Sequence, residues 1–471
     1  MFTSDGWLNE AVKFCSDNLW TYFLLGLLVL CGLYFTVGTR FVQFRMVGEM
    51  FRLLGDKPAQ RKGKRAISSF EAFAVSVATR VGTGNLAGVA SAIAIGGPGA
   101  VMWMWIIALI GAATAFVEST LAQLYKRRDK DSFIGGPAYY IFHGLHSKWM
   151  SVTFAVLLTL TFGLSYNSIQ SNTICGAMHE AFNFDPFWVG VALAAVALII
   201  VFGGIHRIAR VSSVIVPVMA LGYLALAIVV VAMNVSLLPG VFRFIFDNAF
   251  GVGPLAGGAV GAAMLAGIKR GLFSNEAGEG SAPNVAATAH VSHPVKQGLI
   301  QALGVFTDTL LVCSCTAFII LLSGLYTGGE KDGIAITQNA LSAEVGSSGT
   351  YFVAFAILFF AFSSIIGNYY YGEANIRFLT RRRWPVIVFR VLSAGVMVMF
   401  GAMAELPLVW NIGDLFMGLL TMCNLTAIVL LGRYAFRLLN DYRRQKRAGI
   451  KEPTFSADSM PEISDDLDAW K

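Results

Sequence analysis

Two long apolar runs of this 471-residue chain are interrupted near their middle by glycines and polar residues, in corresponding places of the two halves. The first interruption is 78–85, with the sequence ATRVGTGN, and the second is 271–278, with the sequence GLFSNEAG. Backbone outside a regular helix is costly at membrane depth unless protein or a water-filled cavity surrounds it. A matched pair of interrupted spans is therefore typical of the binding site of a secondary transporter.

The composition indicates a membrane protein and excludes several other classes. Hydrophobic residues make up 56% of the chain and charged residues 13%, and apolar runs long enough to cross a bilayer recur along its length. The net charge of +7 does not indicate nucleic acid, because the Lys and Arg residues cluster in short loops, where they set topology. Cysteines and histidines show no metal-ligand spacing, and no catalytic motif occurs. We expect neither an enzyme nor a nucleic-acid-binding protein.

The apolar runs predict eleven membrane-spanning segments. We place them at 19–37, 68–96, 99–125, 149–182, 187–203, 211–233, 254–285, 297–325, 350–378, 384–404 and 408–432. Several are longer than the roughly 20 residues that a bilayer needs, so they must tilt, bend or break. Short amphipathic pieces at 41–54 and 334–345 are expected to lie along the interface.

The basic residues predict the orientation. If the chain crosses eleven times, one side of the membrane receives the basic segments 40–65, 126–130, 207–210, 381–383 and 433–447. This distribution predicts an N-terminus outside the cell and a C-terminus in the cytoplasm.

The first span stands apart from ten others that divide into two sets of five. We expect an extra N-terminal helix and a basic amphipathic segment in 1–67, a first five-helix repeat in 68–240, and a second in 241–436. The last segment, 437–471, is basic and then acidic, and its composition predicts disorder. Since the two sets begin on opposite sides of the membrane, the second repeat is inverted relative to the first.

The first interruption has the features of a site for a zwitterion and a cation. Gly82 and Gly84 flank Thr83 and allow close approach of the backbone. The half-helix that follows offers free N–H groups to a carboxylate, and the half-helix before it ends in free carbonyls, near Ala78 and Val81, that suit a small cation. Close helix packing through small residues is the alternative interpretation.

The second interruption carries more charge. Five polar residues cannot all face lipid, so they must face a cavity, an interface or one another: Lys269, Arg270, Asn275, Glu276 and Glu279. Carbonyls near Phe273 and Ser274 can accept from an ammonium group. The alternative is that this segment is a loop outside the membrane.

Two further spans supply polar side chains. In the fourth, Asn167 and Gln170 are spaced to share one helix face and suit a zwitterionic ligand, although amides also form interhelical hydrogen bonds. In the ninth, Ser363 and Ser364 offer oxygens to an alkali cation, although serines in helices commonly bond back to their own backbone.

These segments resemble the alanine or glycine:cation symporter family, within the amino acid–polyamine–organocation superfamily. The resemblance covers nearly the whole chain, and its most specific carriers are 81–88, 167–172, 271–278 and 362–373. It implies an all-α integral membrane protein with a leucine-transporter-type 5+5 inverted repeat, one extra N-terminal helix and two discontinuous helices. It also implies sodium-coupled uptake of small neutral amino acids across the plasma membrane of a bacterium or archaeon.

The same resemblance implies roles for individual residues. The substrate carboxylate would bind to Thr83, Gly84 and Asn85, and Gln170 and the region of Phe273 would meet the amino group and close over the substrate side chain. The candidate substrate-binding set also includes Gly82, Asn167, Ser274, Asn275 and Asn368. Sodium, as the coupling ion, would be held by the carbonyls of Ala78 and Val81 and the hydroxyls of Ser363 and Ser364.

One position departs from the family pattern. Some relatives have a tryptophan where this chain has Asn368, and that ring caps a small pocket. An amide at this position leaves more room and offers hydrogen bonds, so glutamine joins alanine and glycine as a candidate substrate. A proton-coupled carrier that uses Glu276 or Asp308 is the main alternative, and a membrane-embedded enzyme or a channel is a more distant one. The sequence leaves the oligomeric state open.

Overall fold

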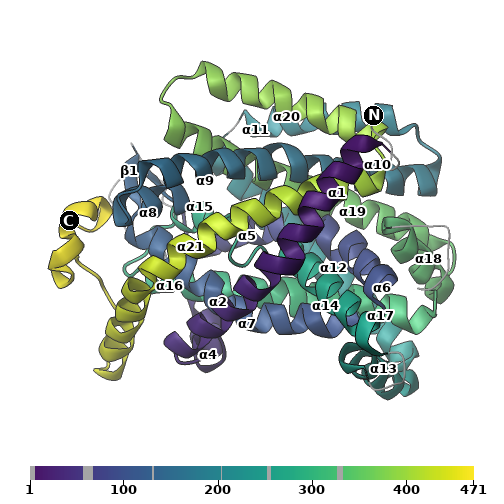
Figure 1. Ribbon diagram of the computed structural model, residues 1–471, viewed down its shortest axis with the longest axis horizontal. Helices are drawn as coiled ribbons and strands as arrows, with labels where there is room; N and C mark the ends of the chain where they lie inside the picture. Colours follow the sequence, from purple (N-terminus) through teal and green to yellow (C-terminus); the bar gives the residue numbers. More distant parts are fainter. Residues whose placement is uncertain (1–5, 57–66, 130–131, 203, 252–255, 326–332) are drawn as a thin grey trace.

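The computed structural model describes residues 6–56, 67–129, 132–202, 204–251, 256–325 and 333–471 (Figure 1). Its regular structure is almost entirely helical, with a single short antiparallel hairpin of β1, Arg127–Asp129, and β2, Ser132–Ile134, in the described residues. The predicted basic segment 57–66 lies outside this description, as does the predicted start of the seventh span at 254.

The described part of the first half contains thirteen α-helices and four shorter helical segments. They are α1 Trp7–Leu19, η1 Trp20–Leu24, α2 Leu25–Gly38, α3 Val42–Arg45, α4 Val47–Leu54, α5 Ser69–Arg80, η2 Gly84–Gly88, α6 Val89–Gly96, α7 Gly99–Leu124, α8 Pro137–Gly144, α9 Lys148–Leu160, η3 Thr161–Tyr166, α10 Asn167–Phe182, α11 Pro186–Val201, α12 Gly204–Met233, η4 Val235–Leu237 and α13 Leu238–Phe250.

The second half continues with helices of similar length. They are α14 Ala256–Asn275, α15 Ala282–Ala286, α16 Val295–Val305, η5 Phe306–Cys313, α17 Ser314–Ser323, α18 Ile334–Val345, α19 Ser348–Leu379, α20 Trp384–Met403, α21 Leu406–Arg447, η6 Ala457–Ser459, η7 Pro461–Asp466 and η8 Asp468–Trp470.

Seven of the described helical stretches are long and apolar enough to cross a membrane, and they match seven of the predicted spans. The helices at 217–233 and 235–250 meet at an angle of 75°, and they make an eighth span if the bent pair crosses as one. The three remaining predicted spans are the two interrupted runs and α11, which is a shorter apolar helix. The chain is therefore a multi-spanning α-helical membrane protein, and the number of eleven crossings stays a prediction.

The two halves interlock around the interrupted helices. In the first half, α7 packs against α14 and α16 of the second half, and α10 packs against α19 and α20. Figure 1 shows α5 near the middle of the bundle, with α1 and α21 crossing it on one side. The division into an extra helix and two repeats at 67/68 and 240/241 stays a prediction.

The C-terminal segment differs from the prediction of disorder. Helix α21 continues to Arg447, and the following residues form η6, η7 and η8 and pack on the ends of other helices, near α8 and β1 (Figure 1). Met460, Ile463 and Leu467 alternate with the acidic residues and are buried. The composition of the segment misled the prediction, because its average charge conceals these regularly placed apolar anchors.

Candidate functional site

The first interruption is a true break between two helices. Helix α5 begins with a capping box, in which Ser68 and Glu71 bond to each other's backbone N–H, and it ends at Arg80. Val81 is extended, with φ −78° and ψ 93°, and a helix restarts at Gly84 as the π-helical segment η2. The N–H groups and carbonyls around Gly82 are thereby freed from helical pairing, as predicted.

Side chains from the same loop and from α10 satisfy the freed N–H groups. The Gly82 N–H donates to Asn85 Oδ1 at 2.9 Å. Both the Thr83 N–H and the Thr83 hydroxyl donate to Gln170 Oε1, at 2.9 and 2.7 Å. An acceptor oxygen thus already lies at the start of the second half-helix, which is the position predicted for a carboxylate.

The end of the first half-helix meets two serines of α19. Ser363 and Ser364 donate to the carbonyl of Ala78 at 3.2 and 3.0 Å, and Ser364 also lies 3.4 Å from the carbonyl of Val81. The four oxygens predicted to bind a cation therefore come together, although Ala78 and Ser364 are 286 positions apart in the sequence. The serines also bond to the carbonyl of Phe360 in their own helix, which is the local bonding that serines in helices commonly make.

The second interruption begins later than predicted. Helix α14 continues through 271–275, because Gly271 has helical geometry and packs against α7, where an added Cβ would lie 2.8 Å from Ile107. The break occupies 276–281, with positive φ at Glu276, Gly278 and Gly280. Phe273 and Ser274 therefore lie in the last turn of a helix, whose carbonyls lack intrahelical partners.

The two interruptions lie in direct contact. A Cβ added to Gly84 would lie 3.0 Å from Ser274 Cα and 3.1 Å from Phe273 Cδ1, so any larger residue would push the two breaks apart by a few tenths of an ångström. The carboxylate of Asp308 in η5 joins them further, because it accepts from Asn85 Nδ2 and from Ser274 Oγ, both at 2.7 Å. Thr309 supplies a third donor at 2.9 Å. The two halves of the chain thus share one buried polar centre.

The charges predicted to need partners have them. Arg270 donates to Asp414 at 2.6 Å and stacks on Trp410, and Lys269 lies 3.3 Å from Asp17 and 3.8 Å from Asp414. At the break, other side chains and N–H groups hold three buried carboxylates, two from the break itself and one, Glu118, from α7. Ser281 donates to Glu276, Tyr166 to Glu279, and the N–H groups of Gly278 and Gly280 to Glu118.

Not every predicted site residue faces the breaks. Asn167 donates to Ser393 of α20 and to the carbonyl of Gly163 one turn earlier, so its side chain does not reach the first break. A spacing of three residues leaves about 60° between the side chains of Asn167 and Gln170, which is enough for them to meet different neighbours. The Asn275 side chain accepts from the Ala277 N–H and so holds the loop. Asn368 is buried one turn beyond Ser364, and neither of its amide atoms has a hydrogen bond within the described residues.

Several residues at this centre were not predicted from the sequence as part of the site. Asp308 was considered only as a proton carrier, although a lone acid in an apolar span is itself a signal of a site. Tyr166 and Trp410 were not predicted either, and they flank the predicted Phe273 in a row of rings whose neighbouring centroids lie 4.7 Å apart. Asn85, Tyr166 and Asp308 also lie in the π-helical segments η2, η3 and η5, which are frequent at functional sites and have no simple sequence signature.

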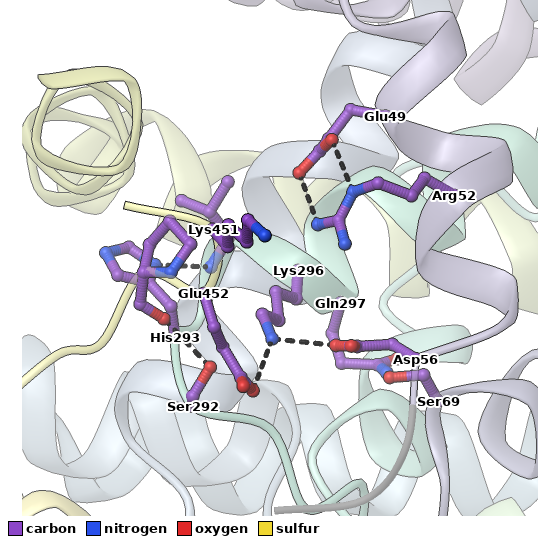
Figure 2. Close-up of polar contacts among 12 residues, drawn as sticks. Glu49, Arg52, Asp56, Ser69, Ser292, His293, Lys296, Gln297, Lys451 and Glu452 are labelled. Carbon is purple, nitrogen blue, oxygen red and sulfur yellow. Dashed lines mark hydrogen bonds and ion pairs between the residues drawn. The ribbon is translucent and has the colours of Figure 1, made fainter. Parts of the chain in front are cut away.

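A polar cluster at the start of α16 closes one end of the bundle (Figure 2). Lys296, which is only 1% exposed, lies 2.7 Å from Asp56 and 3.2 Å from Glu452. Backbone bonds support this closure, from His290 to the carbonyl of Ile67 at the start of α5 and from Phe455 to the carbonyl of Ser292. The C-terminal segment is therefore tied to the helix that carries the first break.

Solved structures support the fold. The structure of MhsT in complex with L-phenylalanine aligns with a TM-score of 0.52 at 13% identity, covering 80% of this chain and 99% of that one. A manganese transporter of Eremococcus coleocola aligns with the same TM-score at 14% identity, covering 88% of this chain and 89% of that one. These likenesses confirm a leucine-transporter-type fold with discontinuous helices and say nothing of what is carried.

Sequence relatives are much closer. A probable sodium/glutamine symporter, GlnT, of Bacillus subtilis is 51% identical over 96% of this chain and 94% of its own length. The amino-acid carrier protein AlsT of the same organism is 47% identical, over 99% and 98%. A sodium/proton-dependent alanine carrier protein of Bacillus sp. strain PS3 is 37% identical, over 84% and 92%.

The model of the sodium:alanine symporter family matches residues 5–457, which is nearly the whole chain. This match confirms the family resemblance that the interrupted segments indicated, and it excludes the enzyme that we considered as a distant alternative. The chain belongs to the sodium:alanine symporter family and is a multi-spanning amino acid transporter.

Proposed function

We propose that this protein couples the uptake of a small neutral amino acid to sodium by alternating access, with alanine, glycine and glutamine as candidate substrates. The observation that carries the proposal is the contact between the two breaks, where Gly84 packs on Ser274 and Asp308 bonds to both halves. Helix ends of opposite polarity meet there, and a zwitterion presents the matching charges.

The substrate carboxylate is proposed to bind at Gly82, Thr83 and Gly84. Gln170 Oε1 now accepts both donors of Thr83, so a carboxylate oxygen that replaces it keeps those donors paired and adds charge assistance. The displaced Gln170 amide is then free to bond to the substrate. The amino group is proposed to meet the carbonyls at the end of α14, next to Phe273 and Ser274.

The coupling ion is proposed to be sodium, bound by the carbonyls of Ala78 and Val81 and the hydroxyls of Ser363 and Ser364. All four groups are neutral oxygens, and a hard cation prefers such ligands. The hydroxyls now donate to the carbonyls, and each can rotate its hydrogen away and offer a lone pair instead. Binding would then fix α5 against α19 and hold the first break in shape.

Asn368 is the reason to include a substrate with a polar side chain. Its amide is 1% exposed and lacks partners in the described part of the chain, and buried polar groups usually have them. It lies one helical turn from Ser364 on the face that meets the first break. A substrate amide would satisfy it, and the 51% identical relative is named a probable sodium/glutamine symporter.

A proton-coupled carrier is the second candidate. Arg80 is the buried cation nearest the breaks, whereas Glu118, Glu276, Glu279 and Asp308 are all buried around them. One guanidinium does not balance four carboxylates, and a proton bound to one of them would reduce the excess of negative charge. One relative is named sodium/proton-dependent, which agrees with either ion.

We place the protein in the inner membrane of a bacterium or archaeon, with the N-terminus outside and the C-terminus in the cytoplasm. The end that is closed by Lys296 and the C-terminal segment is then the cytoplasmic end. One positive charge moving down a potential of about 100 mV releases about 2.3 kcal/mol, enough for a roughly 50-fold gradient of a neutral substrate.

Uptake into proteoliposomes tests the proposal. Labelled alanine, glycine and glutamine are offered under an inward sodium gradient, under an inward proton gradient, and under neither. We expect accumulation with sodium alone, faster when the interior is made negative, and inhibition of each labelled substrate by the others. Accumulation driven by protons and indifferent to sodium would contradict sodium coupling and favour the second candidate.

A further inference from the structure

The turn after α2 places an arginine where the backbone favours glycine. The Phe41 N–H donates to the carbonyl of Thr36 at 2.7 Å and the Arg40 N–H to the carbonyl of Val37 at 2.9 Å, which is the Schellman pattern of a helix end. Arg40 and Phe41 both have left-handed backbones, with φ of 55° and 59°. A side chain in that conformation costs about 1 kcal/mol, so the turn itself gives no reason to keep arginine.

The Arg40 side chain lines a cavity between this turn and α21. The cavity has a volume of about 100 Å³, and three arginines, Arg40, Arg45 and Arg443, contribute to its wall with the hydroxyl-bearing Thr39 and apolar side chains of α3 and α21. The positive charges of Arg40, Arg45 and Arg447 all act on Arg443. Folding therefore gathers like charges that repel one another.

No carboxylate in the described ranges forms an ion pair with these arginines. The acidic side chains on the neighbouring turns are already used: Glu49 by Arg52, Lys446 and Tyr442, and Asp441 by His293, Arg444 and Gln445. Within the described part of the chain, this cluster of guanidinium groups is thus left unneutralised, and planar guanidinium groups suit phosphate oxygens particularly well.

The surface beside the cavity is apolar. Val37 is 64% exposed, Phe41 50% and Phe44 49%, and all three border the turn that carries Arg40. In a helix that crosses a bilayer, such exposed side chains face acyl chains, and the basic cavity begins where α2 ends. A ligand that is anionic at one end and aliphatic at the other would contact both surfaces.

We infer that the basic cavity formed by Arg40, Arg45 and Arg443 binds the phosphodiester of an anionic phospholipid, whose acyl chains lie over Val37 and Phe41. The lipid joins the turn after α2 to α21, two elements that flank the bundle, and it neutralises charges that no described side chain neutralises. It lies apart from the breaks in α5 and α14 and does not depend on which substrate or ion the protein carries.

Native mass spectrometry of the full chain tests this site. The protein is released from micelles that contain zwitterionic phosphatidylethanolamine with phosphatidylglycerol or cardiolipin, and the retained lipid is counted. The variant Arg40→Gln/Arg45→Gln/Arg443→Gln is compared with Arg381→Gln/Arg382→Gln/Arg383→Gln, which removes the same charge between α19 and α20. We expect the first variant to retain the anionic lipids at least about tenfold less than the wild type, and the second to change retention less than about twofold.

Equal losses in both variants would overturn the inference, because the effect would then be one of net charge. Inorganic phosphate that displaces the lipid at comparable concentration would also overturn it, since the acyl chains would then contribute nothing. If the triple variant does not fold, Arg40→Gly takes its place. Glycine relieves the left-handed turn, so this variant should melt at a higher temperature than the wild type and yet retain less anionic lipid. Unchanged retention in a more stable Arg40→Gly protein would contradict the assignment.

Discussion

Replacing Gly82 by alanine should weaken the apparent affinity for sodium. A Cβ at this position would lie 2.3 Å from Ser364 Oγ and 2.9 Å from Gln170 Oε1, both closer than real Cβ contacts allow. To reach 3.0 Å the hydroxyl must retreat by about 0.7 Å, whereas metal ligands are held to within ~0.2 Å. The movement would pull Ser364 from the carbonyls of Ala78 and Val81, with which it now bonds.

The expected size follows from the loss of one well-placed ligand. Disturbing the groups that orient a metal ligand typically lowers affinity about 10- to 100-fold, which corresponds to roughly 1.4 to 2.7 kcal/mol. The assay is the sodium concentration that gives half-maximal uptake into proteoliposomes at saturating substrate. Gly88→Ala is the matched control, because its Cβ would meet only ordinary contacts, 3.7 Å from Thr83 O and 3.8 Å from Trp410.

The control should change the half-maximal sodium concentration less than about twofold. A folded Gly82→Ala protein whose sodium dependence equals that of the wild type would contradict this prediction. The contact with Ser364 would then have no bearing on the ion, and the four oxygens would be an ordinary packing interface.

Three further predictions concern other parts of the centre. Gln170→Ala should raise the KM for substrate about tenfold or more. Asn167→Ala should change the KM little, because the amide of Asn167 bonds to Ser393 of α20 and not to the first break. Equal effects of the two substitutions on uptake kinetics would contradict the orientation of α10. Asp308→Asn should abolish transport and lower the melting temperature. The carboxylate accepts hydrogen bonds from Asn85, Ser274 and Thr309, whereas an amide would turn its NH₂ group toward at least one of these donors. A stable variant that still transports would show that Asp308 does not join the two breaks. Lys296→Met should make 450–471 accessible to limited proteolysis, because Asp56 and Glu452 lose their shared partner. The control is Arg444→Gln, which removes the exposed ion pair with Asp441 and should change the proteolysis little. Equal protection of 450–471 in the wild type and in Lys296→Met would contradict the prediction.

The first break was predicted well from the sequence because its signal is local. Two glycines, at 82 and 84, with polar neighbours inside an apolar run are typical of a discontinuous helix. The second break was placed about five residues early, because Gly271 resembles an interruption in sequence but serves close packing against α7. A glycine that makes room for another helix and a glycine that permits positive φ are identical in a single sequence.

Side-chain direction was harder to predict than position. Asn167 and Gln170 fit the same face by spacing, yet α20 takes one amide and the first break takes the other. The choice depends on where α20 packs, which the sequence of α10 does not contain. The row of Tyr166, Phe273 and Trp410 was missed for the same reason, because its members come from three separate helices.

Asp308 shows what a single sequence conceals at a shared centre. It lies in an apolar span, so a functional role was foreseeable. Its bonds to Asn85 and Ser274 follow from the meeting of the two breaks, which is a property of the fold. The C-terminal segment is the opposite case, because three apolar side chains spaced among acids were visible in the sequence and are buried in the structure.

Binding measurements at equilibrium test most directly whether the joined breaks hold an amino acid and an ion together. The affinity of purified protein for labelled alanine or glutamine is measured over a series of sodium concentrations, and the affinity for sodium is measured with and without the amino acid. If the joined breaks hold both ligands at once, each ligand strengthens the binding of the other by the same factor, as linkage requires. An amino acid affinity that stays constant from sodium-free buffer to saturation would contradict this joint binding.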